Sequence, residues 1–348
     1  MPTGGGDQKA VAVLAVDGGA SKTDVAVVAA DGTVLGRARG PASNHQMVGL
    51  DGAIDSLRST VEEAFGAAGF VEPSRQRASP GGSSALPLGV YCLAGLDLPV
   101  DDERVVPAVL AQGWSAESIV RNDTFAVLRA GSENGWGVGV VCGTGLNCVG
   151  VGPDGASVRF PALGELSGDF TPGGAWLSVR GLGLALRAGD GRGRPTSLRR
   201  SVPAHLGLDS PEAVLEASYS GTLPFDRLMS LAEVVLAAAA AGDGPAMDAV
   251  DQLAAEVVVM VAATVERLGV GTPGSSPPVE VVTGGGLFED PGFCELVLST
   301  LRDRVTTVVL RPLAGRPPLL GAALLGLDAI GAGRGAQVRL RAELRAAG

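Results

Sequence analysis

Two stretches of the chain share one pattern of apolar runs and polar turns. In the first, apolar runs at 11–16 and 25–30 enclose the glycine turn 17–24, and an Asp-Gly turn then leads to a third run at 33–39. Valine-rich runs of this length are typical of β-strands. The pattern therefore predicts three strands joined by two tight turns.

The same pattern returns about 125 residues later in a slightly shorter form. Apolar runs at 138–142, 146–151 and 157–160 predict three more strands, and the turn Gly143-Thr144-Gly145 joins the first two. A repeat this long does not belong to a solenoid, whose units are shorter. It predicts an internal duplication, with two α/β domains of one design facing each other.

The rest of the chain alternates between helical periodicity and short apolar runs. Helices are expected at 48–65, 101–113, 124–130, 290–304 and 318–330, strands at 88–94, 118–121, 279–283 and 306–310, and a largely helical stretch at about 174–270 with loops near 190–196 and 220–225. Segments rich in Pro, Gly and Ser at 70–87 and 271–278 predict surface loops. The basic tail from Ala332 predicts a solvated or frayed helix.

Composition narrows the class of protein. The chain has 348 residues, is 46% hydrophobic and 18% charged, and carries a net charge of -10. This acidity argues against nucleic acid or an anionic membrane as a partner. No run approaches the roughly 18 apolar residues that a membrane span needs, and the first ten residues are polar, so we expect a cytoplasmic protein.

The cysteines lack the spacing of a metal site. The four cysteines are Cys92, Cys142, Cys148 and Cys294, and none belongs to a CxxC pair. Three of them lie in apolar runs, which predicts buried thiols.

Three glycine motifs suggest a nucleotide site. Each of them alone fits a plain turn, but their order along the chain is informative: Gly18-Gly19 in the first hairpin, Gly143-Thr144-Gly145 in the second, and Gly284-Gly285-Gly286 after a late apolar strand. Glycine lets the backbone approach a ligand closely, and turn amides can bind phosphate. We expect the two hairpins to hold phosphates and the third motif to face the adenosine. A Walker loop is a different arrangement, because it leads from a strand into a helix.

These motifs resemble those of the acetate and sugar kinase, Hsp70 and actin superfamily. Within it, the chain is similar to the N-acetylglucosamine kinase and BadF/BadG/BcrA/BcrD ATPase group over about residues 11–330. Asp17 to Thr23 matches that group's DGGxSKT, Gly143 to Asn147 matches GTGSN with Leu146 for Ser, and Thr283 to Gly286 matches the adenosine motif.

The resemblance implies an α/β fold of two duplicated actin-like (ribonuclease H-like) ATPase domains with an interdomain cleft. We expect the first domain at 1–120 and the second at 121–316, with a helical insert at about 174–270. The final helix, about 317–331, is expected to pack back on the first domain.

Three further segments resemble the sugar-binding motifs of N-acetylglucosamine kinases. Asn44-His45 matches their STNHWxxG, with Gln46 in place of Trp, and Asn122-Asp123-Thr124 matches the interdomain acid of TDAAGS. Gly168-Asp169 matches only part of GDEGS, because the Glu is missing and the loop is longer. Both departures bear on which sugar is bound more than on the kinase assignment.

The implied activity is transfer of the γ-phosphate of ATP to the 6-hydroxyl of an amino sugar, with N-acetylglucosamine first. Phosphoryl transfer needs positioning and charge neutralisation. Asp17 could hold Mg²⁺ through water, and Asp123 is the candidate general base, although it could instead cap the helix that follows. The expected ATP-binding residues are Gly18, Gly19, Ser21, Lys22, Thr23, Gly143, Thr144, Gly145, Gly284, Gly285 and Gly286. The expected substrate-binding residues are Asn44, His45, Asp123, Asn147, Gly168 and Asp169.

Several alternatives stay open. Strand alternation could turn Lys22 away from ATP. The sugar could be glucosamine or N-acetylmuramic acid. The chain could instead be the ATPase activator of a radical dehydratase, which shares an iron–sulfur cluster across a dimer, or a sugar sensor, although sensors of this fold carry a helix-turn-helix before the first glycine turn.

We also expect a homodimer.

Overall fold

The computed structural model describes residues 11–70, 86–271, 277–305 and 307–345. The chain divides into two compact units: unit 1 holds the residues up to Gly135 and those from Gly315 onward, and unit 2 holds Trp136–Ala314. The first division falls later than the boundary near residue 120 that the sequence suggested. Residues 71–85 of the loop expected at 70–87 and residues 272–276 of the loop expected at 271–278 lie outside the described residues, whereas residues 86 and 87 belong to a strand.

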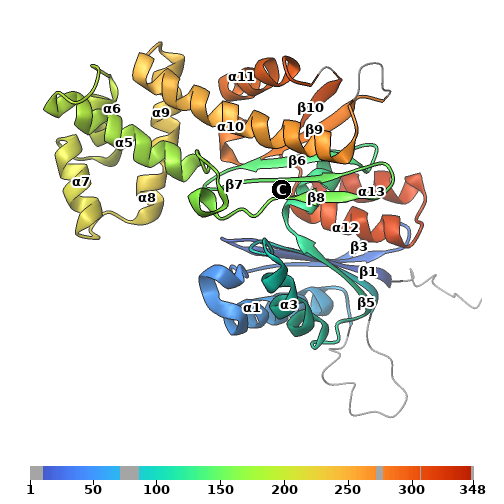
Figure 1. Ribbon diagram of the computed structural model, residues 1–348. Helices are drawn as coiled ribbons and strands as arrows, with labels where there is room; N and C mark the ends of the chain where they lie inside the picture. The colour runs from blue at the N-terminus through green and yellow to red at the C-terminus, as the bar shows by residue number, and fades with distance from the viewer. Residues whose placement is uncertain (1–10, 71–85, 272–276, 306, 346–348) are drawn as a thin grey trace, which may run out of the picture. The chain divides into compact units, whose positions relative to one another are not determined.

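Unit 1 contains a mixed five-stranded sheet (Figure 1). Its strands, in chain order, are β1 (Val11–Gly18), β2 (Thr23–Ala29), β3 (Val34–Gly40), β4 (Leu86–Leu93) and β5 (Ser115–Asn122). They lie in the order β3-β2-β1-β4-β5. The first three form an antiparallel meander, whereas β1, β4 and β5 run parallel, so the carboxyl ends of these last three strands share one edge of the sheet.

Helices cover both faces of this sheet. They are α1 (His45–Ala67), α3 (Pro99–Leu110), α4 (Thr124–Gly131), α12 (Pro318–Ala329) and α13 (Arg334–Arg345). Alternate strand residues such as Leu14 and Val16 form one apolar core with Leu57 and Val61 of α1. On the opposite face α12 packs on β1 and α4. A Cβ added to Gly326 would lie 2.3 Å from Val13 Cγ1, so this packing requires glycine.

The C-terminal tail is more ordered than the sequence suggested. Residues 334–345 form α13, and one face of it is buried through Ala336, Leu340 and Leu344. The carboxylate of Glu343 accepts the backbone N–H of Val34 at 2.7 Å, which fixes the helix against β3. The expected helix is present, but it is packed along one face rather than fully solvated or frayed. Its small apolar stripe, which has a spacing of four residues and lies among arginines, was overlooked in the sequence.

Unit 2 repeats the topology of unit 1. Its strands are β6 (Gly137–Cys142), β7 (Leu146–Val151), β8 (Ser157–Arg159), β9 (Val279–Gly284) and β10 (Val308–Pro312). They lie in the order β10-β9-β6-β7-β8, with an antiparallel meander β6-β7-β8 and parallel neighbours β6, β9 and β10. This order corresponds strand for strand to that of unit 1, which confirms the predicted duplicated α/β fold.

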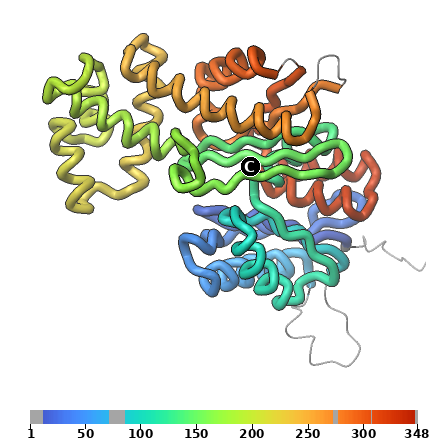
Figure 2. Tube along the Cα trace, in the orientation of Figure 1, coloured from blue at the N-terminus to red at the C-terminus, as the bar shows by residue number. Residues whose placement is uncertain are grey.

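The helices of unit 2 fall into two groups. They are α5 (Gly174–Asp190), α6 (Leu198–Leu206), α7 (Pro211–Tyr219), α8 (Phe225–Met229), α9 (Leu231–Ala240), α10 (Gly244–Leu268) and α11 (Pro291–Arg302), with 3₁₀ turns η1 (Gly164–Ser167) and η2 (Gly286–Glu289). Helix α10 packs on β6 and β7, whereas α5 to α9 cluster beside one end of that sheet (Figure 2). Within the described residues, every helix is too short or too polar to cross a lipid bilayer.

Candidate active site

Polar side chains of unit 1 gather where its parallel strands end. Gly18 of β1 lies opposite Leu93 of β4, and Leu93 lies opposite Asn122 of β5. Asp17 and Asp123 therefore stand at the same edge, two strands apart. Because neighbouring strands are spaced by about 4.8 Å, their backbones are separated by roughly 10 Å.

Asp17 is a buried carboxyl group with a raised pKa. Its residue is only 8% exposed. Burial and, after it, the negative charges of Asp123 and Asp24 together raise its pKa to about 8, although the amine of Lys22 opposes them. A carboxyl group held in this way binds a cation or a proton readily, which is typical of a functional site.

Asp123 is half-buried at the end of β5, and its pKa is raised to about 6 by burial and by the charge of Asp97, with contacts to Thr124 offsetting part of this. Its carboxylate does not cap the next helix. Instead Asn122 Oδ1 accepts the backbone N–H of Thr124 at 2.9 Å. The side chain of Asn122, rather than that of Asp123, therefore makes the hydrogen bond that forms the turn. The Asp123 carboxylate is not used as a helix cap.

Lys22 faces the carboxylates of the first hairpin. Its Nζ lies 3.3 Å from Asp24 Oδ2, and Arg39 Nε donates to Asp24 Oδ1 at 2.7 Å. Burial alone would raise the pKa of Asp24, but Arg39 and Lys22 outweigh burial and lower it. Asp24 pairs across the hairpin with Asp17. Lys22 therefore reaches the side of the sheet that carries Asp17, although half of its side chain is exposed.

The other residues of the first glycine turn either form the turn itself or hold the neighbouring loop in place. Ser21 is exposed, and the Gly19 N–H donates to Lys22 O at 2.8 Å, which closes the turn. The hydroxyl of Thr23 is buried, where it donates to Pro41 O at 2.7 Å and lies 2.8 Å from Ser43 Oγ. It therefore holds the loop that leads to Asn44.

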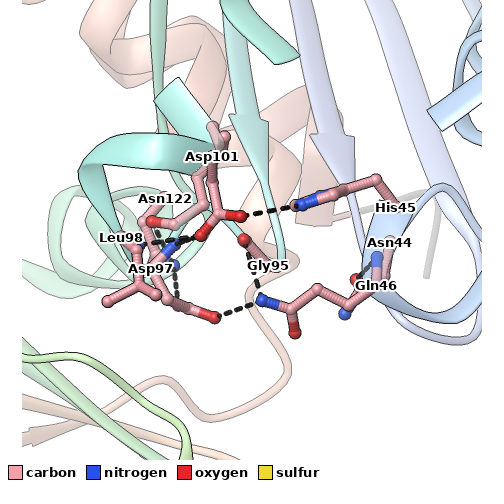
Figure 3. Close-up of polar contacts among 9 residues, drawn as sticks. Asn44, His45, Gln46, Gly95, Asp97, Leu98, Asp101 and Asn122 are labelled. Atoms are coloured by element: carbon pink, nitrogen blue, oxygen red, sulfur yellow. Dashed lines mark hydrogen bonds and ion pairs between the residues drawn. The ribbon is translucent and has the colours of Figure 1, made fainter. Parts of the chain in front are cut away.

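The loop before α1 meets the loop after β4 (Figure 3). Asn44 caps α1 by accepting the backbone N–H of Gln46 at 2.9 Å. His45 Nε2 lies 3.1 Å from Asp101 Oδ1. The pKa of Asp101 is lowered because the N–H of Leu98 and the His45 ring outweigh the effect of burial. Both Asn44 and His45 thus stand beside the strand edge that carries Asp123.

Two glycine motifs meet in unit 2. Val141 of β6 pairs with Gly284 of β9, so the Gly284-Gly285-Gly286 segment lies against the turn that follows β6. That turn is closed by the Gly143 N–H, which donates to Gly145 O at 2.9 Å, and Thr144 at its tip is exposed. At Gly285 the φ angle is 92°, and a Cβ there would lie 2.4 Å from Cys142 O. Only glycine fits this approach.

The N-terminus of α5 is fixed to the same turn. The N–H of Gly174 donates to Gly143 O at 2.7 Å, and that of Ala175 donates to Thr144 O at 2.9 Å. The loop that contains Gly168 and Asp169 precedes this helix, and Asp169 is buried and accepts a hydrogen bond from Ser167 Oγ at 2.9 Å. Asn147 lies half-buried on β7.

Sequence reasoning missed several carboxylates. Asp24, Asp97 and Asp101 join the unit 1 cluster, but they occupy ordinary turn and helix-start positions. In unit 2, Glu256 of α10 binds the backbone N–H of Phe170 near Asp169, and its pKa is raised by burial. No sequence signal links Glu256 to that loop. In the part of the chain that the structure describes, no group of three acidic, His or Cys side chains could hold a metal ion by itself.

A model of the BadF/BadG/BcrA/BcrD ATPase family matches residues 14–326, which includes the strand ends of both units. The chain belongs to this family. The recognition made from the glycine motifs is thereby confirmed.

Two relatives of this BadF/BadG/BcrA/BcrD ATPase family member carry kinase names. An N-acetylmuramic acid/N-acetylglucosamine kinase of Clostridium acetobutylicum is 27% identical over 281 residues, which is 81% of this chain and 87% of the relative. An N-acetyl-D-glucosamine kinase of Dictyostelium discoideum is 25% identical over 328 residues, or 90% and 97% of the two chains.

Solved structures agree with the fold. A candidate N-acetylglucosamine kinase from Chromobacterium violaceum has a TM-score of 0.66 and 26% identity, and it covers 90% of this chain and 98% of its own. A ROK family glucokinase from Streptomyces griseus, in complex with glucose and AMPPNP, has a TM-score of 0.53 and 16% identity, over 90% and 98% of the chains. The second likeness concerns the fold alone.

Proposed function

We propose that this protein is an ATP-dependent kinase that transfers the γ-phosphate of ATP to the 6-hydroxyl of an amino sugar, most directly N-acetylglucosamine. The observation that carries the proposal is the pair of carboxyl groups at one strand edge, buried Asp17 and half-buried Asp123, whose pKa values are raised to about 8 and about 6. The names of the two relatives point to the amino sugar class. A cytoplasmic location and a homodimer belong to the same proposal.

Asp123 is the proposed general base. A carboxylate with a pKa near 6 is ionised at neutral pH, yet it is more basic than an ordinary aspartate. It would accept the proton of the sugar 6-hydroxyl as that oxygen attacks the γ-phosphorus. Asn44 and His45, which lie beside the same edge, would bind other sugar hydroxyls.

The residues of unit 2 would hold the nucleotide and part of the sugar. Backbone amides of the Gly143-Thr144-Gly145 turn would bind phosphate oxygens, and Gly284 to Gly286 would lie against the adenosine. Buried Thr283 Oγ1 has no hydrogen-bond partner among the described residues, which fits a ligand contact beside that motif. Asn147, Gly168 and Asp169 would contact the sugar.

Magnesium fits the oxygen donors of unit 1. Mg²⁺ prefers carboxylate and water ligands and retains several waters, so a single carboxylate such as that of Asp17 is enough. When bound with ATP, the ion supplies neutralisation of the phosphate charge. The chain's own part is to keep Asp17 buried and close to Lys22.

The activator ATPase is less well supported. All four cysteines of the chain are described, and Cys92, Cys142 and Cys148 are buried within strands, whereas Cys294 is half-buried on α11. Burial raises the pKa of each thiol. A cluster shared between subunits needs accessible thiolates.

We expect the purified protein to release ADP from Mg-ATP when N-acetylglucosamine or N-acetylmuramic acid is present. A coupled ADP assay across these sugars, glucosamine and glucose tests this, and ³¹P–¹H NMR of the product locates the phosphate. ADP release that no sugar changes would contradict the sugar kinase and favour the activator.

Lys22→Met should raise the KM for ATP by about 10-fold, because it removes a charge-assisted bond to a phosphate oxygen. Because Lys22 opposes the raised pKa of Asp17, we also expect the pH dependence of the KM for Mg-ATP to move to higher pH. Steady-state kinetics from pH 5.5 to 9 measure both effects. Arg58→Met is the matched control, since Arg58 pairs with Asp55 on the exposed side of α1. Equal KM values for the two variants would refute a phosphate role.

A further inference from the structure

A chain of hydrogen bonds leads from the start of α1 to the turn that presents Asp123. Gln46 Nε2 donates to Asp97 Oδ2 at 3.1 Å, and Asn122 Nδ2 donates to Asp97 Oδ1 at 3.0 Å. Asn122 Oδ1 then accepts the N–H of Thr124. Figure 3 shows Asp97 between the two amide side chains.

We propose that Gln46 is a positioning residue of the active site: through Asp97 it fixes the turn formed by Asn122 and Asp123. The inference rests on the proposed kinase function only for its activity readout. Gln46 need not touch the substrate, because its effect passes through Asp97.

Burial makes the central carboxylate sensitive to its partners. Asp97 is 7% exposed and Asn122 is 2% exposed, so water does not readily replace a lost bond. Hydrogen bonds to a charged group are stronger than neutral ones, and a buried acceptor left without its donor is costly. The negative charge of Asp97 also raises the pKa of Asp123, so its position matters for the proposed base.

The backbone is shaped for this contact. Gly95 has a φ angle of 86°, and a Cβ there would lie 2.6 Å from Asn44 Oδ1. Only glycine lets the β4–α3 loop approach α1 so closely. Gln46 Nε2 makes two hydrogen bonds to this loop, because it donates to Gly95 O at 3.1 Å as well as to Asp97. A primary amide supplies both hydrogens.

Residue 46 is a point at which this chain departs from the resembling motif. The resembling N-acetylglucosamine kinase motif has Trp after Asn-His, and an indole has a single N–H. Gln46 can donate to Gly95 and Asp97 together, so a side chain with two hydrogen bonds stands where the motif has an aromatic ring. This gives the departure from the motif a structural meaning.

The experiment exchanges the donor and the acceptor. Gln46→Glu places a second carboxylate beside Asp97, and Asp97→Asn sets two amides with their donors facing each other. The double variant Gln46→Glu/Asp97→Asn restores one amide–carboxylate bond and keeps an oxygen for Asn122. Its net charge equals that of the wild type, because one carboxylate is gained and one is lost. Gln112→Glu is the control, because Gln112 follows the far end of α3, where it bonds to Arg58 and Ala108.

We expect each single variant to lower kcat by about 10-fold with a smaller change in the KM for ATP, and the double variant to recover to within about 3-fold of the wild type. Amide hydrogen exchange at Thr124 should quicken in the singles and slow again in the double. Gln112→Glu should change neither quantity.

Two outcomes would overturn the inference: a double variant as slow as the product of its singles, or slow singles with unchanged exchange at Thr124. A wild type that phosphorylates no sugar would instead contradict the proposed function. In that case the exchange of Thr124 still tests whether Gln46 positions the turn.

Discussion

Asp123→Asn is expected to lower sugar phosphorylation by about 100-fold to 10,000-fold while sugar binding is retained. The amide has the size of the carboxyl group but cannot accept the proton of the 6-hydroxyl. The fold of the turn should survive, because Asn122 rather than Asp123 binds the N–H of Thr124. Turnover is measured by ADP release, and binding by calorimetry with the sugar that the wild type prefers.

Asp55→Asn is the control for this variant, since Asp55 lies exposed on α1 of the same unit and pairs with Arg58. In the wild type, kcat/KM should fall below pH 6, because Asp123, with its pKa raised to about 6, becomes protonated there. Full activity of Asp123→Asn would exclude the base assignment.

Asp17→Asn is expected to abolish Mg-ATP turnover and yet to stabilise the protein. The folded state raises the pKa of Asp17 to about 8, from an ordinary value of 3.8. Between these values the unfolded chain is ionised while the folded chain retains its proton, so stability falls as the pH rises from about 4 to 8. Removing the acid should raise the free energy of unfolding at pH 7.5 by on the order of 2–4 kcal/mol.

Asp24→Asn provides a control of opposite sign. Arg39 and Lys22 lower the pKa of Asp24, so its ionised form stabilises the folded state above the ordinary pKa and loses that effect as the pH falls. This variant should be less stable at neutral pH. Denaturant unfolding at pH 4 and pH 7.5 compares all three proteins. A less stable Asp17→Asn at pH 7.5 would contradict the raised pKa.

The sequence predicts the duplicated sheet well, and the reason is local. Val11 to Val16 and Val138 to Cys142 are valine-rich runs, each followed by a glycine turn and a second run, so the hairpins need no tertiary information. The late apolar strand ending at Gly284 could be recognised in the same way. Asp17 and Asp123 were predicted as site residues because each stands at the end of a strand.

The side-chain pairings of the candidate site depend on tertiary contacts and could not be predicted in this way. Asp24 looks like any strand residue until Arg39, from a neighbouring strand, approaches it. Gln46 and Asp97 are separated by 51 positions, and their bond depends on the φ angle of Gly95. Glu256 reaches the loop of Asp169 only because α10 packs against the second sheet. Such pairings carry no periodic signal in a single sequence.

The packing of α12 on unit 1 also has a consequence for synthesis. Unit 2 is continuous in the chain, whereas unit 1 needs a helix that emerges roughly 190 residues after α4. At ribosomal speed that delay is about 10–40 s, during which the faces of Val13 and Ala126 that α12 will cover stay open to water. All five strands of the first sheet emerge before the second sheet begins, but the face that α12 covers stays open until after β10 has emerged, so a chaperone that shields β1 would act in this interval.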